Sequence, residues 1–334
     1  MLGGAQMKYL ITGGAGFIGS NFIKYMINKY PNDNFVCLDL LTYASSIEAL
    51  KDVENNPNFK FVYGDICDKD LITNLFKEEA FDYVVNFAAE SDVDRSFLLE
   101  ELFYKTNVEG VKILLEAAIK FNVKRFHQVS TDEVYGPSIN DIAFTEESPL
   151  YPTTPYSKSK AMADEIVLDI FSKYNLNVTI SRSTNNYGCY QHPEKLIPKV
   201  VKMALNKENI TVYGNGLNMR DWLYVADHSI AIDLILHQGK NGEIYNINGD
   251  SERTNLWIVK EILKLLNLED SHIIYTSDRP IDDCRYLLNS DKIKTELNWR
   301  PTFNFDEQFK KTINWFKENN DWLIRISRKS YIQK

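Results

Sequence analysis

Short apolar runs with the length of buried strands alternate with segments of helical spacing through the first half of this 334-residue chain. The run Lys8–Thr12 is followed by Phe17–Tyr30, in which Ile18, Phe22 and Met26 recur at helical spacing. Strands that alternate with helices predict parallel βαβ units, because parallel neighbours need a long crossover connection. This alternation constrains the fold more than any other feature of the sequence.

The same pattern continues to about residue 185. Further strands are expected at Phe35–Leu40, Phe59–Tyr63, Tyr83–Ala88 and Arg125–Ser130, with helical patterns at Ser46–Glu54, Lys69–Glu79 and Thr106–Phe121. Near-continuous apolar strands are typical of a sheet that helices cover on both faces. The sequence therefore predicts an α/β fold with a doubly wound parallel sheet of the Rossmann type.

Longer loops with scattered Pro, Gly and aromatic residues follow this regular part. We predict a nucleotide-binding domain at 7–185 and a smaller, mainly substrate-binding lobe at 186–334, from which some segments can return to the first domain. Residues 1–6 precede the first strand and lack the basic and apolar regions of a signal peptide. They are expected to be a cloning remnant or an upstream start.

The composition of the chain limits the kinds of partner that the protein is expected to bind. Hydrophobic residues make up 44% and charged residues 25%, as in ordinary globular chains, and the net charge is −8. An acidic chain without a long basic run is expected to bind neither nucleic acid nor an anionic membrane, and no apolar stretch is long enough for a membrane span. The four cysteines form no C-x-x-C pair, which favours a reducing cytoplasm, and no metal site is predicted.

A glycine-rich turn joins the first strand to the first helix. Gly14, Gly16 and Gly19 satisfy G-x-G-x-x-G, and Gly13, Gly16 and Gly19 satisfy G-x-x-G-x-x-G. Such glycines allow a tight turn and let the backbone approach a pyrophosphate at a helix N-terminus. The alternative is a turn kept only for helix–sheet packing, but the strand before it and the amphipathic helix after it favour a dinucleotide site.

An acidic residue stands where this kind of site needs one. Asp39 ends the second strand, 20 residues after Gly19, and is placed to accept hydrogen bonds from a ribose 2′-hydroxyl and to repel a 2′-phosphate. Leu40, Leu41 and Thr42 add no cation, so NAD is favoured over NADP.

The next two strand ends supply the rest of the expected cofactor site. Asp65-Ile66 could hold an adenine edge, and the small Ala88-Ala89 pair leaves room for a nicotinamide ribose, although alanines at a strand end also serve ordinary packing. The expected cofactor-binding residues in this part of the chain are Gly13, Gly16, Phe17, Ile18, Gly19, Asp39, Thr42, Asp65, Ile66, Ala88, Ala89 and Thr106.

A Y-x-x-x-K motif begins a later helix. Tyr156 and Lys160 are four residues apart, so they share one face of the helix that starts after Thr154-Pro155. A nearby ammonium favours the phenolate, which would let Tyr156 act as a base near neutral pH. In isolation the motif describes a solvated helix face, but after a dinucleotide turn it is typical of short-chain dehydrogenases/reductases in their extended form, in which both residues also contact NAD.

The segment Ser130–Glu133 follows a buried strand, where ligands of doubly wound sheets bind. Thr131 could hydrogen-bond a sugar hydroxyl that Tyr156 deprotonates. Asp132 and Glu133 form a candidate acid/base pair whose surroundings would separate their pKa values. The alternative, a surface Asp-Glu at a turn, is disfavoured by the position.

Several longer segments together resemble the nucleotide-sugar 4,6-dehydratases of the extended short-chain dehydrogenase/reductase family, and are most similar to those acting on dTDP-glucose. Related 4-epimerases share the glycine turn and Y-x-x-x-K but usually lack the Asp-Glu pair. The segments are NFAAESDVDRS (Asn86–Ser96), VSTDEVYG (Val129–Gly136), PYSKSK (Pro155–Lys160), NNYGCYQHPEKLIP (Asn185–Pro198), RDWLYVADH (Arg220–His228) and DRPIDDCRY (Asp278–Tyr286).

The resemblance implies a reaction. Tyr156 would take the proton of the sugar C4 hydroxyl while hydride passes from C4 to NAD. Glu133 would remove the C5 proton, Asp132 would protonate the departing C6 hydroxyl, and the hydride would return to C6. The enzyme would be a lyase that holds NAD tightly and releases a 4-keto-6-deoxy nucleotide sugar.

The resemblance also implies a substrate site and a homodimer formed through the helices near Thr106–Phe121 and Tyr156–Tyr174. Lys195, Arg220 and Arg279 would offset the diphosphate charge, since guanidinium groups make bidentate bonds to phosphate, and Tyr213 would lie against the base. The implied substrate residues are Ser91, Thr131, Asn185, Lys195, Leu196, Tyr213, Arg220, Asn255, Arg279 and Tyr331.

Two departures from the family pattern concern the substrate. Asp92 stands where these enzymes usually have histidine, and Asp282 stands where a histidine usually approaches the phosphates. Acids beside a diphosphate are repulsive, so a UDP-sugar such as UDP-N-acetylglucosamine or UDP-glucose remains an alternative to dTDP-glucose. A nucleotide-sugar 4-epimerase is the rival activity, and a non-catalytic NAD-sensing protein is the rival class, which the intact catalytic residues disfavour.

Overall fold

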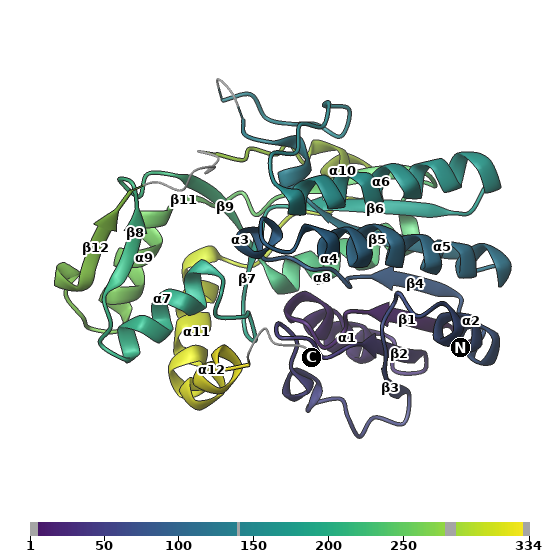
Figure 1. Ribbon diagram of the computed structural model, residues 1–334, viewed down its shortest axis with the longest axis horizontal. Helices are drawn as coiled ribbons and strands as arrows, with labels where there is room; N and C mark the ends of the chain where they lie inside the picture. The colour runs from purple at the N-terminus through teal and green to yellow at the C-terminus, as the bar shows by residue number, and fades with distance from the viewer. Residues whose placement is uncertain (1–5, 139–140, 278–284, 330–334) are drawn as a thin grey trace.

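The computed structural model describes residues 6–138, 141–277 and 285–329. Within them, seven parallel strands form the main sheet in the order β10-β6-β5-β4-β1-β2-β3 (Figure 1). The strands are β1 (Lys8–Thr12), β2 (Asn34–Asp39), β3 (Phe59–Tyr63), β4 (Tyr83–Asn86), β5 (Arg125–Thr131), β6 (Val178–Ser183) and β10 (Glu243–Ile247). The prediction of a doubly wound, Rossmann-type parallel sheet is confirmed.

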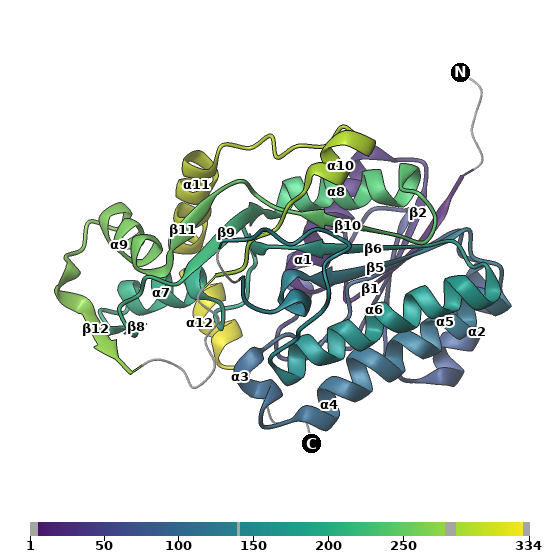
Figure 2. The ribbon, with the colours of Figure 1, turned by 90° about the horizontal axis from the view of Figure 1, so that it is seen from above.

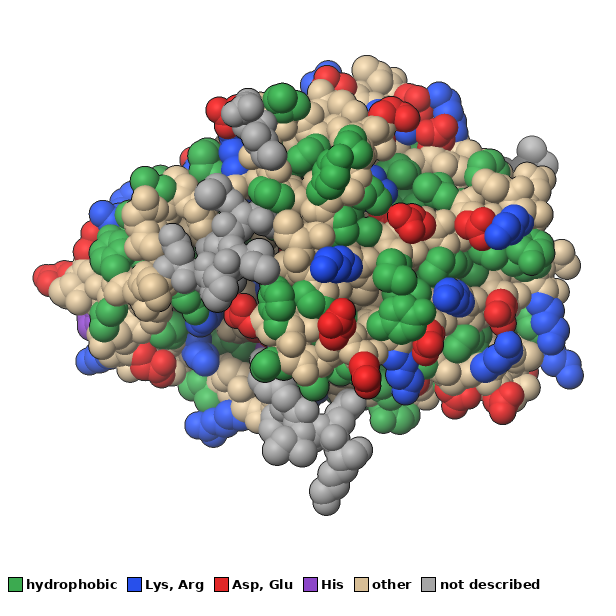
Figure 3. Space-filling view, turned by 45° about the horizontal axis from the view of Figure 1, so that its top comes forward, with side chains coloured by type: hydrophobic (Ala, Val, Ile, Leu, Met, Phe, Trp, Pro, Cys, Tyr) green, Lys and Arg blue, Asp and Glu red, His purple; other side chains and the backbone are tan. Residues whose placement is uncertain are grey.

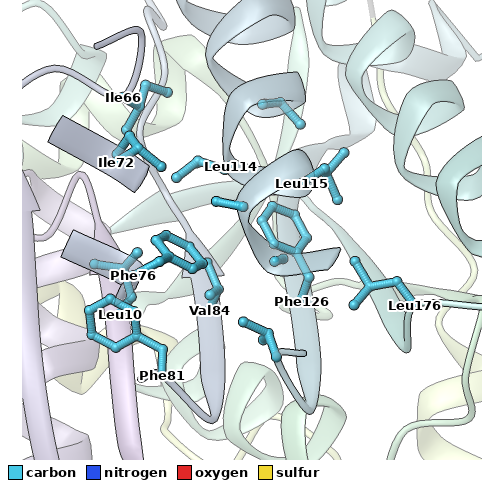
Figure 4. Packing of buried hydrophobic residues seen from close by; sticks show 14 of the residues in the cluster. Leu10, Ile66, Ile72, Phe76, Phe81, Val84, Leu114, Leu115, Phe126 and Leu176 are labelled. Atoms are coloured by element: carbon cyan, nitrogen blue, oxygen red, sulfur yellow. The ribbon is translucent and has the colours of Figure 1, made fainter. Parts of the chain in front are cut away.

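Helices cover both faces of this sheet, as Figure 2 shows from above. One face carries α2 (Lys69–Glu79), α5 (Gly110–Lys120) and α6 (Pro155–Tyr174), and the other carries α1 (Phe17–Lys29) and α8 (Val225–Gln238). Successive strand side chains point to opposite faces. Leu10 therefore packs in the first cluster, together with Phe76, Leu114 and Phe126 (Figure 4), whereas its neighbours Tyr9 and Ile11 pack in the second.

A smaller lobe adjoins one end of the sheet (Figure 1). It contains a three-stranded sheet and a two-stranded one, and four of its helices enclose a separate apolar core. Its strands are β7 (Asn185–Tyr187), β9 (Met219–Tyr224) and β11 (Glu252–Thr254), then β8 (Ile210–Tyr213) and β12 (Ile273–Thr276), and its helices are α7 (Leu196–Leu205), α9 (Asn255–Leu265), α11 (Phe305–Glu318) and α12 (Asn320–Ser327).

Two segments from the second half of the chain return to the main sheet. Helix α8 covers one face, and β10 pairs in parallel with β6 at the edge of the sheet. The short α10 (Asp291–Glu296) contributes Ile293 to the apolar cluster around Tyr245 of β10. The main sheet and the smaller lobe are therefore interleaved along the chain after residue 185.

Two expected helices differ in detail. The segment expected to be helical at Ser46–Glu54 contains only a short 3-10 helix at Ile47–Leu50, in which just Ala49 and Leu50 are buried. The other begins earlier than expected, because α4 (Glu100–Tyr104) runs through a wider π-helical turn at Lys105–Glu109 into α5.

Side-chain hydrogen bonds of Asn107 connect the wide turn to two other segments. The buried Asn107 amide donates to the backbone oxygen of Glu90 (3.0 Å) and accepts from the backbone N–H of Glu90 (2.9 Å). It also donates to the Ser159 hydroxyl on α6 (2.9 Å). Single π turns of this kind often occur at functional sites, and here the turn anchors the loop that follows β4. Across the ranges given above, no helix combines the length and apolar character that a membrane crossing requires.

Candidate active site

A cavity of about 410 Å³ lies at the carboxyl ends of the central strands. The loops after β1, β2, β3, β4 and β5 line it, and the segment from Ser183 to Lys195 closes it on the side of the smaller lobe. Since β1 pairs with β2 on one side and with β4 on the other, the cavity opens where the strand order reverses. Doubly wound folds bind their ligands at this point.

The glycine turn forms the floor of one half of the cavity. Gly13 has φ +66°, and a Cβ on it would lie 2.6 Å from the backbone nitrogen of Ala88. A Cβ on Gly19 would lie 2.5 Å from the Gly13 oxygen. Gly16 is the N-cap residue of α1 and has no side chain to accept hydrogen bonds from the N–H groups of the first turn. These donors are therefore left for a ligand. The turn fits a pyrophosphate at the helix N-terminus.

Asp39 lies beside this turn. Its buried carboxylate accepts from the backbone N–H groups of Ala15 (2.9 Å) and Leu41 (2.7 Å), which fix its orientation. Burial raises the pKa of Asp39, and these two bonds and the Ser45 hydroxyl oppose the rise. Each carboxylate oxygen has lone pairs left for a ribose hydroxyl. Every residue expected to bind the cofactor lines the cavity, so the residues present fit a bound NAD molecule.

Tyr156 and Lys160 project from the first turns of α6 into the other half of the cavity, and both are buried. The helix begins at this point because Thr154 caps it, accepting from the Ser157 backbone N–H (3.1 Å), and Pro155 takes the first position. The Lys160 ammonium donates to the Val129 oxygen at the end of β5 (2.7 Å).

The expectation that the Lys160 ammonium favours the phenolate of Tyr156 differs from the structure, in which the pKa of Tyr156 is raised. Burial raises its pKa, and the Glu133 carboxylate raises it further, while a hydrogen bond with Thr131 opposes the rise. Lys160 is itself held at the Val129 oxygen, and burial lowers its pKa to about 8. Proximity of the two side chains does not by itself favour the phenolate, because desolvation disfavours the charged form.

Thr131, Asp132 and Glu133 come together at the end of β5, where the chain turns into a 3-10 helix. The Thr131 hydroxyl accepts from the Glu133 backbone N–H (3.3 Å) and donates to Asp132 Oδ1 (3.2 Å). Asp132 is only 4% exposed, and its Oδ2 atom has no partner among the described residues. Burial raises the pKa of Asp132 to about 8, with a smaller contribution from Glu133. A carboxylic acid with a pKa of about 8 therefore lines the same cavity as Tyr156.

The residues expected to bind substrate fall into three groups. Ser91, Thr131, Asn185 and Lys195 line the cavity, where the Lys195 ammonium donates to the backbone oxygen of Ser91 (2.7 Å). Arg279 and Tyr331 lie outside the described residues. The members that do not line the cavity are Leu196, Tyr213, Arg220 and Asn255.

Those four residues belong to the smaller lobe. Leu196 packs against the apolar core of that lobe. Arg220 of β9 pairs in register with Arg253 of β11, and Asn255 at the start of α9 follows two residues after Arg253. The Arg220 guanidinium lies 4.9 Å from the centre of the Tyr286 ring. Arg220 nevertheless acts on the cavity, since its charge opposes the rise in the pKa of Asp132.

Several cavity residues were not among those singled out from the sequence. Glu90 follows β4, Asn186 lies in β7, and the other residues lie in the loop before α7, all within segments that carry the family resemblance. Only that resemblance could have drawn attention to them, because neighbouring residues in a loop have no periodic signal. These residues are Glu90, Asn186, Gln191, His192 and Glu194.

Asp92 has a structural role as well as a charge. It caps the short α3 (Val93–Ser96) by accepting from the Arg95 backbone N–H (3.0 Å). Its carboxyl also shares a hydrogen bond with Glu194, and burial raises the pKa of Asp92. The second departure, Asp282, lies outside the described residues.

The doubly wound sheet, with its glycine turn and the Tyr156–Lys160 helix at one cavity, places the protein in the class of extended short-chain dehydrogenases/reductases. A family model described as GDP-mannose 4,6 dehydratase matches residues 10–312, and the chain belongs to this family. The resemblance noted from the sequence is therefore confirmed.

Known proteins of similar sequence and structure agree with this assignment. A dTDP-glucose 4,6-dehydratase from Haemophilus influenzae is 44% identical, over 94% of this chain and 99% of that protein. The structure of a dTDP-glucose 4,6-dehydratase from Bacillus anthracis in complex with NAD has a TM-score of 0.89 at 43% identity and covers 96% of this chain and 99% of that one. A UDP-glucose 4-epimerase from Thermotoga maritima has a TM-score of 0.87 at 28% identity, covering 94% and 100%.

Proposed function

We propose that the protein is an NAD-dependent lyase that converts dTDP-glucose to its 4-keto-6-deoxy product by 4,6-dehydration. The observation that carries the proposal is the buried Asp132, held protonated beside Glu133 in the cavity that also contains Tyr156 and the dinucleotide turn. An elimination needs one group to donate a proton and another to accept one. The relatives named above support dTDP-glucose as the substrate.

The first stage uses Tyr156 and Thr131. Tyr156 acts as the phenolate, whose oxygen receives the proton of the C4 hydroxyl, and the Thr131 side chain beside it orients that hydroxyl. Lys160 holds the cofactor side of the cavity in place, since its ammonium bridges α6 to the end of β5. NAD, when bound, would supply the hydride acceptor for C4 and, once reduced, the hydride donor for C6.

The second stage uses the acid pair. Oxidation at C4 acidifies the C5–H bond, and Glu133 removes that proton. Asp132 then donates its proton to the departing C6 hydroxyl, which leaves as water. The two neighbouring carboxyls are suited to opposite tasks because Asp132 is deeply buried, and burial keeps it in the acid form.

The diphosphate end of the substrate faces the segment that carries Ser91, Asn185 and Lys195. Lys195 supplies positive charge there, and Arg220, Tyr213 and Asn255 contribute to the proposed substrate site from the smaller lobe. Asp92 and Glu194 add negative charge next to Lys195. Because UDP-sugars and dTDP-sugars carry the same diphosphate, this charge does not distinguish them, and UDP-sugars enter the test as the alternative substrates.

The test is the identity of the product. Purified protein, without added cofactor, is offered dTDP-glucose, UDP-glucose and UDP-N-acetylglucosamine, each deuterated at C4. We expect loss of one water from dTDP-glucose and recovery of the deuterium at C6, as read by mass spectrometry and NMR. A product that keeps its 6-hydroxyl would indicate the epimerase activity instead, and absence of turnover with every sugar would favour a non-catalytic NAD-binding protein. Washout of the label would contradict the return of hydride by the same NAD.

We further propose a homodimer formed through the helices on the α5–α6 side of the sheet, in the cytoplasm, where the thiols of Cys37, Cys67 and Cys189 stay reduced. Figure 3 shows hydrophobic side chains between charged ones over this part of the surface. Large apolar side chains exposed near it are Phe97, Leu98, Leu99, Tyr104 and Met162. Patches of this kind mark association surfaces.

The dimer is tested by mass in solution. Light scattering should give twice the 38.7 kDa of one chain. Met162→Glu should shift this towards the single-chain value, because it buries a charge at the centre of the proposed interface, whereas Ile274→Glu, an exposed apolar site on the smaller lobe, should not. A wild-type protein that stays monomeric at assay concentration would contradict the proposal.

A further inference from the structure

The segment from α12 to Lys329 returns to the cofactor half of the cavity. Helix α12 belongs to the smaller lobe, where Trp322, Leu323 and Ile326 pack in its apolar core, and Figure 1 shows it at the junction with the main sheet. From there it reaches the loop after β2. The Trp322 indole donates to the Ser46 hydroxyl (3.4 Å), and Arg325 pairs with Glu48 (2.7 Å).

Lys329 makes the third of these contacts. Its ammonium donates to the backbone oxygen of Ser45 at 2.7 Å, and Ser45 lines the cavity beside Asp39. The charge of Lys329 attracts the Asp39 carboxylate and opposes the rise in the pKa that burial causes there. The sequence alone indicated no cation near Asp39, because the two residues are 290 positions apart.

We propose that Lys329 is a cofactor-positioning residue, whose ammonium, tethered to Ser45, stabilises the Asp39 carboxylate that receives the ribose hydroxyls of the dinucleotide. The inference rests on the proposed use of NAD. The last helix of the smaller lobe thereby closes the adenosine end of the cofactor site.

Retention of the cofactor matters in the proposed reaction. Hydride leaves C4 and returns to C6 of the same sugar, so a cofactor lost between the two stages would leave an oxidised intermediate behind. Lys329 follows the last helix of the smaller lobe, so its ammonium connects this lobe to the cofactor site. It holds the adenosine end while the reacting end changes its redox state.

The charges around Asp39 determine the pH dependence that this arrangement predicts. The charge of Lys329 attracts the Asp39 carboxylate, whereas the Cys37 thiol would repel it if ionised. Glu48 attracts Lys329 and forms an ion pair with Arg325. Removing the ammonium should raise the pKa of Asp39. NAD affinity should then start to fall at a higher pH as the solution is acidified, because protonated Asp39 is a poorer acceptor.

The experiment compares Lys329→Met with Arg328→Met, which removes the same charge from the adjacent exposed residue. NAD released on denaturation is counted first, and NAD is then titrated calorimetrically onto the stripped full-length proteins between pH 5 and 9. We expect Lys329→Met to weaken NAD binding about two- to fivefold, as for an exposed ion pair, with the pH midpoint shifted upwards. Arg328→Met should match the wild type in both.

Identical pH profiles for Lys329→Met and Arg328→Met would overturn the inference, and so would a change in melting temperature without a change in the profile. If the wild-type protein neither carries nor binds NAD, it is the proposed function that fails, and this is known before the variants are compared.

A second pair of variants tests where the ammonium lies. Asp39→Asn removes the charge that repels a 2′-phosphate, so NADP affinity relative to NAD should rise while Lys329 is present to pair with the phosphate. Adding Lys329→Met to Asp39→Asn should abolish most of that gain. A gain that persists in the double variant would place Lys329 away from the ribose and would contradict the inference.

Discussion

Tyr156→Phe should lower the turnover of dTDP-glucose by about 10²–10⁴-fold, the usual contribution of a general acid–base group. The variant keeps the ring, which packs edge-on against Phe103, so the loss comes from the hydroxyl that bonds Thr131. Because oxidation at C4 is the first step, the nicotinamide absorbance of NADH should not appear after substrate is added. Stopped-flow absorbance and product analysis measure both effects.

Tyr174→Phe is the matched control. Tyr174 ends the same helix and is 60% exposed, so removing its hydroxyl should leave turnover within about twofold of the wild type. Normal accumulation of NADH in Tyr156→Phe would show that another group accepts the C4 proton. The assignment of Tyr156 as the base would then be wrong, although the dehydratase reaction itself would stand.

Asp132→Asn should stop the reaction one stage later. Asparagine has the shape of a protonated aspartate, so C4 oxidation should proceed, but the amide cannot donate a proton to the departing C6 hydroxyl. Enzyme-bound NADH should therefore accumulate after substrate addition, with turnover lowered by about 10²–10⁴-fold. Glu133→Gln should instead abolish exchange of the C5 proton with solvent deuterium while C4 oxidation remains measurable.

The pH profile gives an independent measurement of the same acid. Asp132 must be protonated to act, and burial raises its pKa to about 8. The elimination step should therefore fall about tenfold per pH unit above about pH 8, as the acid form of Asp132 is lost. The step is isolated by starting from pre-formed 4-keto intermediate in single-turnover experiments. A rate that rises through pH 8 would show that Asp132 acts as a base.

The sequence by itself was enough to predict those parts of the site that depend on local order along the chain. The glycine turn, Asp39 and the segment Thr131–Glu133 each follow a buried strand, and parallel strands bring their carboxyl ends to one edge of the sheet. The spacing of Tyr156 and Lys160 placed both on one face of a helix. The limits of single elements also depend on local order, and the expected limits of β3 and α2 agree with the structure residue by residue.

Only the tertiary structure determined what depends on residues far apart in the chain. The high pKa of Asp132 and the raised pKa of Tyr156 arise chiefly from burial, which no spacing reveals. The approach of Lys329 to Asp39 depends on how the smaller lobe packs on the loop after β2. Periodicity reports which side of an element is apolar, whereas desolvation and long-range electrostatics follow from which elements pack together.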